Sequence, residues 1–395
     1  MSISTDDVVI VGAARTPYGR INGGLASLPG TALGAHAIAA ALAAAGIPGA
    51  DVEVVVLGQV LQAGAGQNPA RQAALAAGIA PGAHAIALNK VCLSGLTAVI
   101  DAARLIRTGE AAVAVAGGME SMSQAPHLLT GTRAGWVYGD RTALDHLAYD
   151  GLRDAVDGDA MGALTERGNA ALALTRAEQD AVAARSHRLA AAARADGVLA
   201  AEIAPVTVRS RKGDVLVAED EGVRPDTTEE TLAGLRPAFA PDGTITAGNS
   251  SQLSDGAAAV VLTSRAEAQR RGAPVLAAVD AAGQVAGPDN SLHSQPARAI
   301  DAALTRAGWT VGDLDLVEIN EAFAAVVCRS QAELGVDPGR VNIHGGAIAL
   351  GHPIGSSGAR LVVHAAHELA RRGGGRAAVG LCGGGGQGEA LLLRA

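Results

Sequence analysis

The sequence predicts an α/β fold built from two similar halves around largely buried sheet structure. Short Val- and Ile-rich runs alternate with Ala-rich helical patterns before residue 120, and the same order returns near the end of the chain. The two parts also match each other at a nearly constant spacing along the sequence. The segment between them is richer in charged and loop residues, which indicates an insertion.

In the first half, each expected strand is a short apolar run, and each expected helix is a stretch with apolar residues at helical spacing. The strands are expected at residues 8–11, 52–57, 86–88 and 113–116. The helices are expected at residues 32–45, 69–77 and 96–106. Continuous apolar runs of this kind are typical of strands that are covered on both faces.

The second half repeats the first in a common register. Residues 37–46 match residues 299–308, and residues 51–57 match residues 313–319, in both cases 262 positions later. The pairs Ser94-Gly95 and Ala116-Gly117 match Ser357-Gly358 and Val379-Gly380, 263 positions later. Ala-rich helices look alike by chance, but the agreement of the strands and the Ser-Gly turns favours a duplication.

We therefore divide the chain into three parts. One core half comprises residues 1–121 and 249–272, and the other comprises residues 273–395. Residues 122–248 are expected to form an inserted loop domain over the core, with one long helix at residues 176–196 and a polar stretch at residues 209–214. Loops on a rigid core are a common place for ligand contacts, so this domain is expected to bind substrate.

Composition excludes several classes of protein. The net charge of −8 and the pI of about 5.7 argue against a nucleic-acid partner. Three cysteines in 395 residues do not suggest a disulfide framework, which favours a reducing, cytoplasmic location. No signal peptide is expected at the N-terminus, and the uncharged stretch at residues 72–89 contains Gly78 and Pro81, so it is not expected to cross a membrane.

Cys92 is the first candidate for chemistry. It ends an apolar run just before the helix expected at residues 96–106, so it should lie at or just before a helix N-terminus. Such a position favours a thiolate and is expected to lower the thiol pKa, to about 7 in a reactive cysteine. A lone cysteine is more often a small buried hydrophobic residue, so this stretch alone leaves both interpretations open.

Three other polar or glycine-rich stretches also follow expected strands or precede helices. They are Asn320-Glu321-Ala322-Phe323, the stretch at residues 345–358 that contains His352, and Cys382-Gly383-Gly384-Gly385-Gly386. Ligands bind at strand ends in α/β proteins, and the repeat places Cys92 and His352 before equivalent Ser-Gly pairs. Two cysteines, a histidine and an asparagine in one site suit thiol chemistry.

Other readings of the motifs are weaker. A nucleotide-binding dehydrogenase would need a second glycine soon after the first strand, where this chain has Gly12-Ala13-Ala14-Arg15. His364 and His367 do not form the His-Glu-x-x-His pattern of a zinc site, and no metal is expected. Cys328 lies within a helical pattern at residues 324–334 and is expected to be buried.

Together these stretches resemble the thiolase family, and within it the short-chain acetyl-CoA acetyltransferases, over essentially the whole chain. The resemblance includes residues 9–17, 117–123, 235–239 and 246–251 besides the four stretches above. It implies a five-layered αβαβα thiolase fold and reversible conversion of two acetyl-CoA into acetoacetyl-CoA and CoA. It also implies dimers that pair into a homotetramer, and CoA as substrate and product with no tightly bound cofactor.

The resemblance implies a role for each catalytic residue. Cys92 would attack the thioester and carry the acetyl group, and His352 would accept its proton. Cys382 would remove the α-proton of the second acetyl-CoA. Asn320 would position a water that, with His352, stabilises the enolate oxygen, and the N–H groups of Cys92 and Gly384 would form a second oxyanion hole. Release of CoA between the half-reactions implies ping-pong kinetics.

The resemblance also implies the residues that hold CoA. Those expected along the pantetheine tunnel are Leu152, Met161, Ala247, Ser251, Ala322 and Phe323. Those expected near the nucleotide are Arg224, Ala238 and Phe239. Core packing is an alternative for Leu152, Met161 and Phe239, and a solvated charge for Arg224. Two departures from close relatives, Ala160 in place of a histidine and the bulky Leu93 beside Cys92, are expected to influence substrate selection.

Two alternative functions remain at this point. The first is a longer-chain 3-ketoacyl-CoA thiolase of fatty-acid β-oxidation. The second, of another class, is a non-catalytic acyl-CoA-binding or complex-forming protein, against which the joint presence of Cys92, Asn320, His352 and Cys382 argues. A β-ketoacyl synthase is set aside, because it would use two histidines, or a histidine and an asparagine, rather than a second cysteine such as Cys382.

Overall fold

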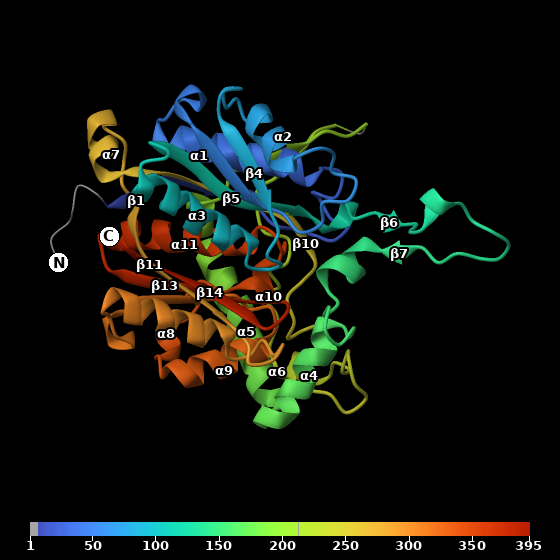
Figure 1. Ribbon diagram of the computed structural model, residues 1–395. Helices are drawn as coiled ribbons and strands as arrows, with labels where there is room; N and C mark the ends of the chain where they lie inside the picture. Colours follow the sequence, from blue (N-terminus) through green and yellow to red (C-terminus); the bar gives the residue numbers. More distant parts are fainter. Residues whose placement is uncertain (1–6, 212) are drawn as a thin grey trace.

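The computed structural model describes residues 7–211 and 213–395. Residues 1–6, on which the expected lack of a signal peptide partly depends, and Lys212 of the polar stretch lie outside the described residues. The core has five layers (Figure 1). Helices α1 and α2 cover one half-sheet, α8 and α9 cover the other, and α3 and α11 lie between the two. This arrangement confirms the predicted αβαβα fold.

The first half contains the elements expected there. Its strands are β1 (Val8–Arg15), β2 (Gly19–Arg20), β3 (Val54–Gly58), β4 (His84–Leu88), β5 (Val113–Ser121) and β10 (Ser254–Ser264). Its helices are α1 (Gly30–Ala45), α2 (Pro69–Ala76), α3 (Ser94–Thr108) and α7 (Arg265–Arg271). Strand β10 returns from the insertion to pair with β5 and β1.

The second half and the insertion follow. The strands of the second half are β11 (Ala277–Ala286), β12 (Leu316–Ile319), β13 (Arg376–Gly383) and β14 (Gln387–Arg394), and its helices are α8 (Gln295–Ala307), α9 (Ala324–Leu334), α10 (Ala347–Leu350) and α11 (Ser357–Arg372). The insertion contains the hairpins β6 (His127–Leu128) with β7 (Leu144–Asp145) and β8 (Val206–Val208) with β9 (Val215–Val217), and the helices α4 (Met161–Leu172), α5 (Arg176–Ala195) and α6 (Glu229–Ala233).

Strand order shows the duplication directly. One half-sheet runs β1-β10-β5-β3-β4, and the other runs β11-β14-β13-β12 in the same relative order. The two are joined where Val8–Ile10 of β1 pair with Ala277–Val279 of β11. Helices α1 and α8 end at Gly46 and Gly308, both in the left-handed conformation that glycine adopts readily. The predicted repeat is therefore confirmed in both register and topology.

Helices α3 and α11 meet at their N-termini, and this contact requires glycine. A Cβ atom on Gly95 would lie 2.8 Å from the backbone nitrogen of Ala359, and one on Gly358 would lie 2.5 Å from that of Leu96. Neither separation is possible for real Cβ atoms, so the two Ser-Gly pairs allow the helix ends to touch. The segments just before these helices, which carry Cys92 and His352, are thereby brought together.

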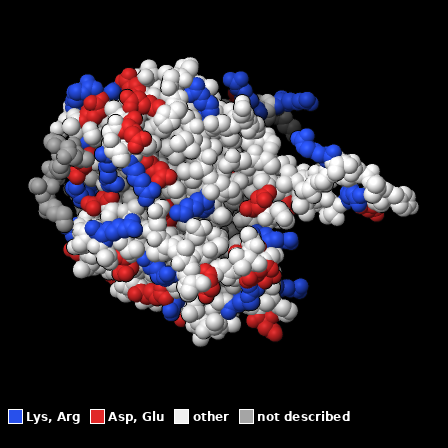
Figure 2. All heavy atoms as spheres, in the orientation of Figure 1, with Lys and Arg blue, Asp and Glu red and all other residues white. Residues whose placement is uncertain are grey.

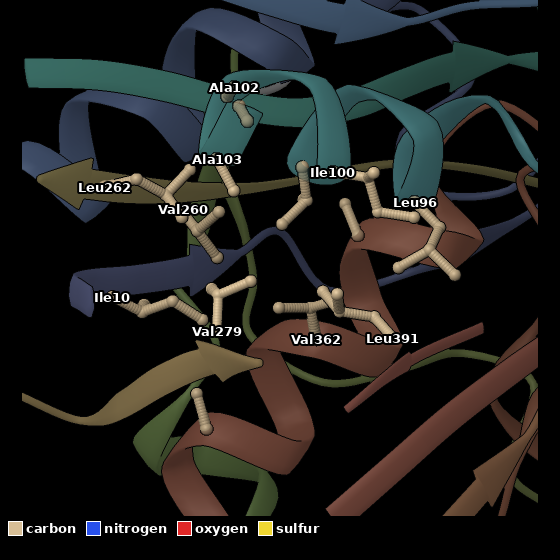
Figure 3. Close-up of a cluster of buried hydrophobic side chains, with 14 of the residues drawn as sticks. Ile10, Leu96, Ile100, Ala102, Ala103, Val260, Leu262, Val279, Val362 and Leu391 are labelled. Atoms are coloured by element: carbon tan, nitrogen blue, oxygen red, sulfur yellow. The ribbon is translucent and has the colours of Figure 1, made fainter. Parts of the chain in front are cut away.

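An apolar core fills the space around this middle layer (Figure 3). Leu96 and Ile100 of α3 and Val362 of α11 pack with strand residues such as Val260 and Leu391. These side chains are almost completely buried. The core thus fixes both helices, and the loops in front of them, relative to both half-sheets.

Two strands continue well past their predicted C-terminal ends, and glycine and alanine are the reason. Strand β1 continues to Arg15 and β5 to Ser121, whereas the expected ends were residues 11 and 116. The added residues include Gly12 and Gly118, whose Cβ atoms would lie within 2.2 Å of the backbone oxygens of Ala41 and Gly355. Small residues disfavour strands by propensity, but close packing of backbones requires them here.

The insertion is more regular than a set of loops. Helix α5, predicted at residues 176–196, begins with a capping box between Thr175 and Glu178 and packs on α9 and α10 of the second half. The hairpin β6–β7 forms an arm that extends away from the core (Figure 1). Within the described part of the chain, no helix has both the length and the apolar character needed to cross a membrane.

Candidate active site

A cavity of about 450 Å³ lies between the core loops and the insertion. Its core side carries residues from the four stretches singled out above, and its other wall comes mainly from the insertion and the segment that follows it. The core loops contribute Val91, Cys92, Leu292, Ala322, Phe323, His352, Ile354, Cys382, Gly383 and Gly384. The other wall contributes Ala148, Gly151, Leu152, Arg153, Ala160, Met161, Gly162, Phe239 and residues 250–253, with Met122 at the start of the insertion. An elongated ligand with few polar groups fits such a lining.

Cys92 lies on a tight turn between β4 and α3, immediately before the first turn of the helix, as predicted. Val91 has a φ of 52°, a conformation that is unfavourable for a β-branched residue and costs on the order of 1–3 kcal/mol. Ser94 holds the turn because its Oγ accepts from the Lys90 N–H at 2.8 Å and donates to the Val91 carbonyl at 2.6 Å. Strain at this point presents the thiol to the cavity.

The expected lowering of the Cys92 pKa is wrong for the protein without substrate. Burial among apolar side chains disfavours the thiolate and raises the pKa of Cys92 to about 11, although the N–H groups of Cys92 and Gly384 oppose the shift. The nearby carboxyl group of Glu120 raises it further. The helix N-terminus is present as expected, but desolvation outweighs it.

This raised pKa has a measurable consequence in alkylation by iodoacetamide. Because only the thiolate reacts, the rate for Cys92 should still rise by about tenfold per pH unit above pH 9, where an ordinary thiol has levelled off. The measurement is the pseudo-first-order rate of loss of the unmodified Cys92 peptide by mass spectrometry, with glutathione as the reference thiol. A plateau at or below pH 8 would contradict the assignment.

His352 lies in the loop between α10 and α11, and its partners fix its tautomer. The Ser357 hydroxyl donates to the Pro353 carbonyl at 3.0 Å, so in its 2.5 Å contact with His352 it accepts from Nδ1–H. Nε2 is then unprotonated and available as a base. Burial, and secondarily the charge of Arg360, lower the pKa of His352 to about 4, so the ring is neutral at pH 7.

Asn320 follows β12 and lies behind His352 rather than on the cavity wall. Its Nδ2 is 3.5 Å from Nε2 of His352, and its Oδ1 has no hydrogen-bond partner among the described residues. The neighbouring Glu321 is fully buried and accepts from Ser186, Asn342 and the Ile348 N–H. Glu321 thereby fixes the backbone that positions the Asn320 amide.

Cys382 is at the end of β13, buried, and close enough to Cys92 for the two thiols to influence each other. Burial, and then the neighbouring Cys92, raise the pKa of Cys382. Gly384 lies two residues further along, and its N–H contacts the Cys92 sulfur. A Cβ atom on Gly384 would make only an ordinary contact with Val91 at 3.4 Å, so packing within the protein alone does not require glycine there.

Glu120 is a residue near the site that sequence reasoning missed. It is fully buried and accepts from the N–H groups of Val60, Leu61 and Gly355, which ties the first half to the loop that carries His352. Burial raises its pKa to about 7. The sequence shows a carboxyl residue after Gly117-Gly118-Met119, but nothing in the pattern reveals that three backbone N–H groups converge on it.

The residues expected to hold CoA fall into two groups. Six line the cavity: Leu152, Met161, Phe239, Ser251, Ala322 and Phe323. Arg224, Ala238 and Ala247 are exposed and lie outside its lining. Phe239 packs edge-on against Phe323 at 6.3 Å between ring centres, which joins the insertion to the second half. Leu152 and Met161 also pack against small apolar clusters beside the cavity, so for these two residues core packing and a place in the cavity wall occur together.

Two smaller expectations need correction. Leu93 is completely buried and does not line the cavity. It packs so closely against Gly383 that a Cβ atom on this glycine would lie 2.6 Å from Cγ of Leu93. It therefore supports the Cys382 strand and cannot contact an acyl chain directly. Cys328 is only partly buried, and its Sγ lies 3.7 Å from the carbonyl oxygen of Glu178 at the start of α5. Ala160, in contrast, lines the cavity.

Comparisons with known proteins agree with this geometry. The model of the thiolase N-terminal domain matches residues 8–266, and that of the thiolase C-terminal domain matches residues 273–395. A probable acetyl-CoA acetyltransferase of Mycolicibacterium smegmatis is 60% identical over 98% of this chain and 100% of its own length. The acetyl-CoA acetyltransferase of Shinella zoogloeoides is 48% identical over 99% of both chains. The crystal structure of the Bacillus anthracis acetyl-CoA acetyltransferase superposes with a TM-score of 0.96, at 38% identity over 98% of both chains.

Proposed function

Because the chain belongs to the thiolase family, we propose that it is an acetyl-CoA C-acetyltransferase, which converts two acetyl-CoA into acetoacetyl-CoA and CoA and catalyses the reverse thiolysis. The observation that carries this proposal is the meeting of Cys92, His352 and Cys382 in one apolar cavity. Relatives with this name match the chain over its full length, which supports the same activity. The enzyme is an acyltransferase with CoA as a substrate and product.

In the first half-reaction, Cys92 attacks the thioester of acetyl-CoA. Both the thiol and the imidazole are neutral at pH 7, so the Cys92 proton moves to Nε2 of His352 during the attack rather than before it. The N–H groups of Cys92 and Gly384, which contact the sulfur, are suitably placed to stabilise the oxyanion on the acetyl carbon. CoA then takes the proton from His352 and leaves.

In the second half-reaction, the Cys382 thiol gives its proton to the neutral Nε2 of His352 as its sulfur removes a proton from the methyl group of another acetyl-CoA. The thioester oxygen gains negative charge as the enolate forms. The Nε2–H that His352 has just gained and a water held by Asn320 stabilise this oxygen, a role that the unpartnered Oδ1 of Asn320 and its 3.5 Å contact with Nε2 support. The carbon nucleophile then attacks the acetyl group on Cys92, the bond from carbon to the Cys92 sulfur breaks, and this sulfur takes the proton from Nε2 of His352 as acetoacetyl-CoA is released.

CoA is proposed to bind between the insertion and the second half. Its pantetheine arm lies along Leu152, Met161, Ser251, Ala322 and Phe323, with Ala247 near the entrance. Arg224, Ala238 and Phe239 lie toward the nucleotide, where exposed positions suit a solvated group. We assign substrate binding to residues 122–248, and the core halves to residues 1–121 with 249–272 and to residues 273–395.

Comparison of two thiolysis substrates tests the function. We expect a strong preference for acetoacetyl-CoA over a 3-ketoacyl-CoA of eight or more carbons, with parallel lines when free CoA is varied, as ping-pong kinetics require. A comparable or faster rate with the long chain would make the protein a general β-oxidation thiolase. No turnover of either substrate would favour a binding-only protein.

We also propose that the chain forms a homotetramer, with the β6–β7 arm as one contact. The arm, which also carries a few charged side chains near its tip (Figure 2), exposes Leu129, Trp136, Val137 and Tyr138, the last of these completely. Apolar surface of this extent is typical of an interface. Light scattering should give the mass of a tetramer for the native chain and a smaller mass for Trp136→Ser/Tyr138→Ser, and an unchanged mass would contradict the role of the arm.

The cytoplasm is the proposed location. Cys92, Cys328 and Cys382 are all free thiols, and the chemistry assigned to two of them requires the reduced state.

A further inference from the structure

Glu389 is a buried carboxylate that the mechanism above does not use. It lies on β14, one position beyond the residue that pairs with Cys382, and its side chain is completely covered. A carboxylate in such a position requires partners because burial removes its hydration. Its partners come from three different elements, and two of these belong to the other half of the chain.

The contacts of Glu389 connect the two cysteine-bearing segments. Lys90, two residues before Cys92, places Nζ 3.0 Å from Oε1. Thr97, in the first turn of α3, donates to Oε2 at 2.5 Å. Gln284 of β11, directly opposite Glu389 in the sheet, donates its side-chain N–H to Oε1.

The turn held by this carboxylate is strained. Val91, between Lys90 and Cys92, has a φ of 52°. Such a conformation persists only where the surrounding contacts hold it. The hydrogen bonds of Ser94 act within the turn, whereas Glu389 anchors it to the strand pair that ends at Cys382. One side chain therefore sets the position of the Cys92 turn relative to Cys382.

We propose that Glu389 is a positioning residue that holds the Cys92 turn at a fixed separation from Cys382. Acetyl transfer to Cys92 needs this cysteine and His352, and the position of His352 depends on α11 and Ser357, which Glu389 does not touch. Making or breaking the carbon–carbon bond needs both sulfurs. Loss of Glu389 should therefore impair the second step more than the first, an inference that rests on the proposed function.

Two rates measured on the same variants test this. We expect Glu389→Leu to lower kcat for acetoacetyl-CoA thiolysis by about 100-fold, the typical effect of a displacement near 1 Å, with little change in KM. Exchange of acetyl groups between acetyl-CoA and labelled CoA, which involves Cys92 alone of the two cysteines, should change by less than about threefold. Glu389→Gln and Lys90→Met remove the ion pair at constant size and should show the same selectivity to a smaller extent.

Asp280→Asn is the matched control. Asp280 pairs with Arg394 across the same two strands, β11 and β14, but at their other end. This variant should leave the ratio of the two rates unchanged. If Glu389→Leu does not fold, the same two rates measured on Glu389→Gln and Lys90→Met provide the test.

A parallel fall of both rates, or no change in either, would overturn the inference, because a purely structural residue lowers the melting temperature without altering the ratio. The wild-type protein separates this failure from failure of the proposed function. If the native chain catalyses neither reaction, the function is wrong; if it catalyses both and the variants behave like it, only the role of Glu389 is wrong.

Discussion

Cys92→Ala should abolish covalent acetylation and lower kcat for thiolysis by a factor on the order of 10⁴–10⁶, the loss typical for removal of a catalytic nucleophile. The alanine retains the strained turn and the N–H groups of the oxyanion hole but offers no atom that can form a thioester. Cys382 cannot substitute for it, because Cys382 is buried at the end of β13 and its pKa is raised.

The measurement is incorporation of label from [¹⁴C]acetyl-CoA, followed by peptide mapping of the quenched protein. Cys328→Ala is the control because this cysteine lies on α9, outside the cavity lining, and should label like the native chain. Label that persists in the active-site peptides of Cys92→Ala would show that another group is the nucleophile.

Much of the fold could be predicted from the sequence because its physical basis is local. Val-rich runs and Ala-rich helices specify the α/β order, and the matched Ser-Gly pairs identify the two halves. The exact ends of β1 and β5 could not be predicted. Gly12 and Gly118 disfavour strands by propensity, and only the backbones packed against them, Ala41 and Gly355, explain why they extend the strands.

The candidate site was predictable as a set of residues but not as an electrostatic environment. Cys92, His352 and Cys382 stand in recognisable motifs and meet in the cavity, whereas their protonation depends on side chains distant in sequence. Helix position alone suggested a lowered pKa for Cys92, and the apolar cavity raises it. Glu120, which holds the His352 loop, was not identifiable because the N–H groups it accepts from come together only through the fold. Ser357 is only five residues from His352, but the sequence pattern does not show which ring nitrogen its hydroxyl contacts.

Cys382→Ser should separate the two half-reactions. We expect it to take up label from [¹⁴C]acetyl-CoA at Cys92 as the native chain does, while condensation and thiolysis fall by a factor on the order of 10²–10⁴, the usual contribution of a general base. The physical reason is that removal of a proton from the weakly acidic methyl group requires a strong base. Burial already raises the pKa of the Cys382 thiol, which makes its thiolate a strong base, but a serine hydroxyl cannot ionise in the same apolar surroundings.

Serine is the most informative replacement for Cys382 because it changes only the sulfur atom and leaves the end of β13 undisturbed. Gly383→Ala is unsuitable as a control, since its Cβ would lie 2.6 Å from Leu93 and displace the same strand. Cys328→Ser, the same exchange outside the cavity lining, is suitable and should leave both half-reactions intact. If Cys382→Ser loses acetylation together with thiolysis, Cys382 acts in the first step and the assigned division between the two sulfurs is wrong. If both rates are retained, another base removes the α-proton. The unprotonated Nε2 of His352 is then the base that remains in the site.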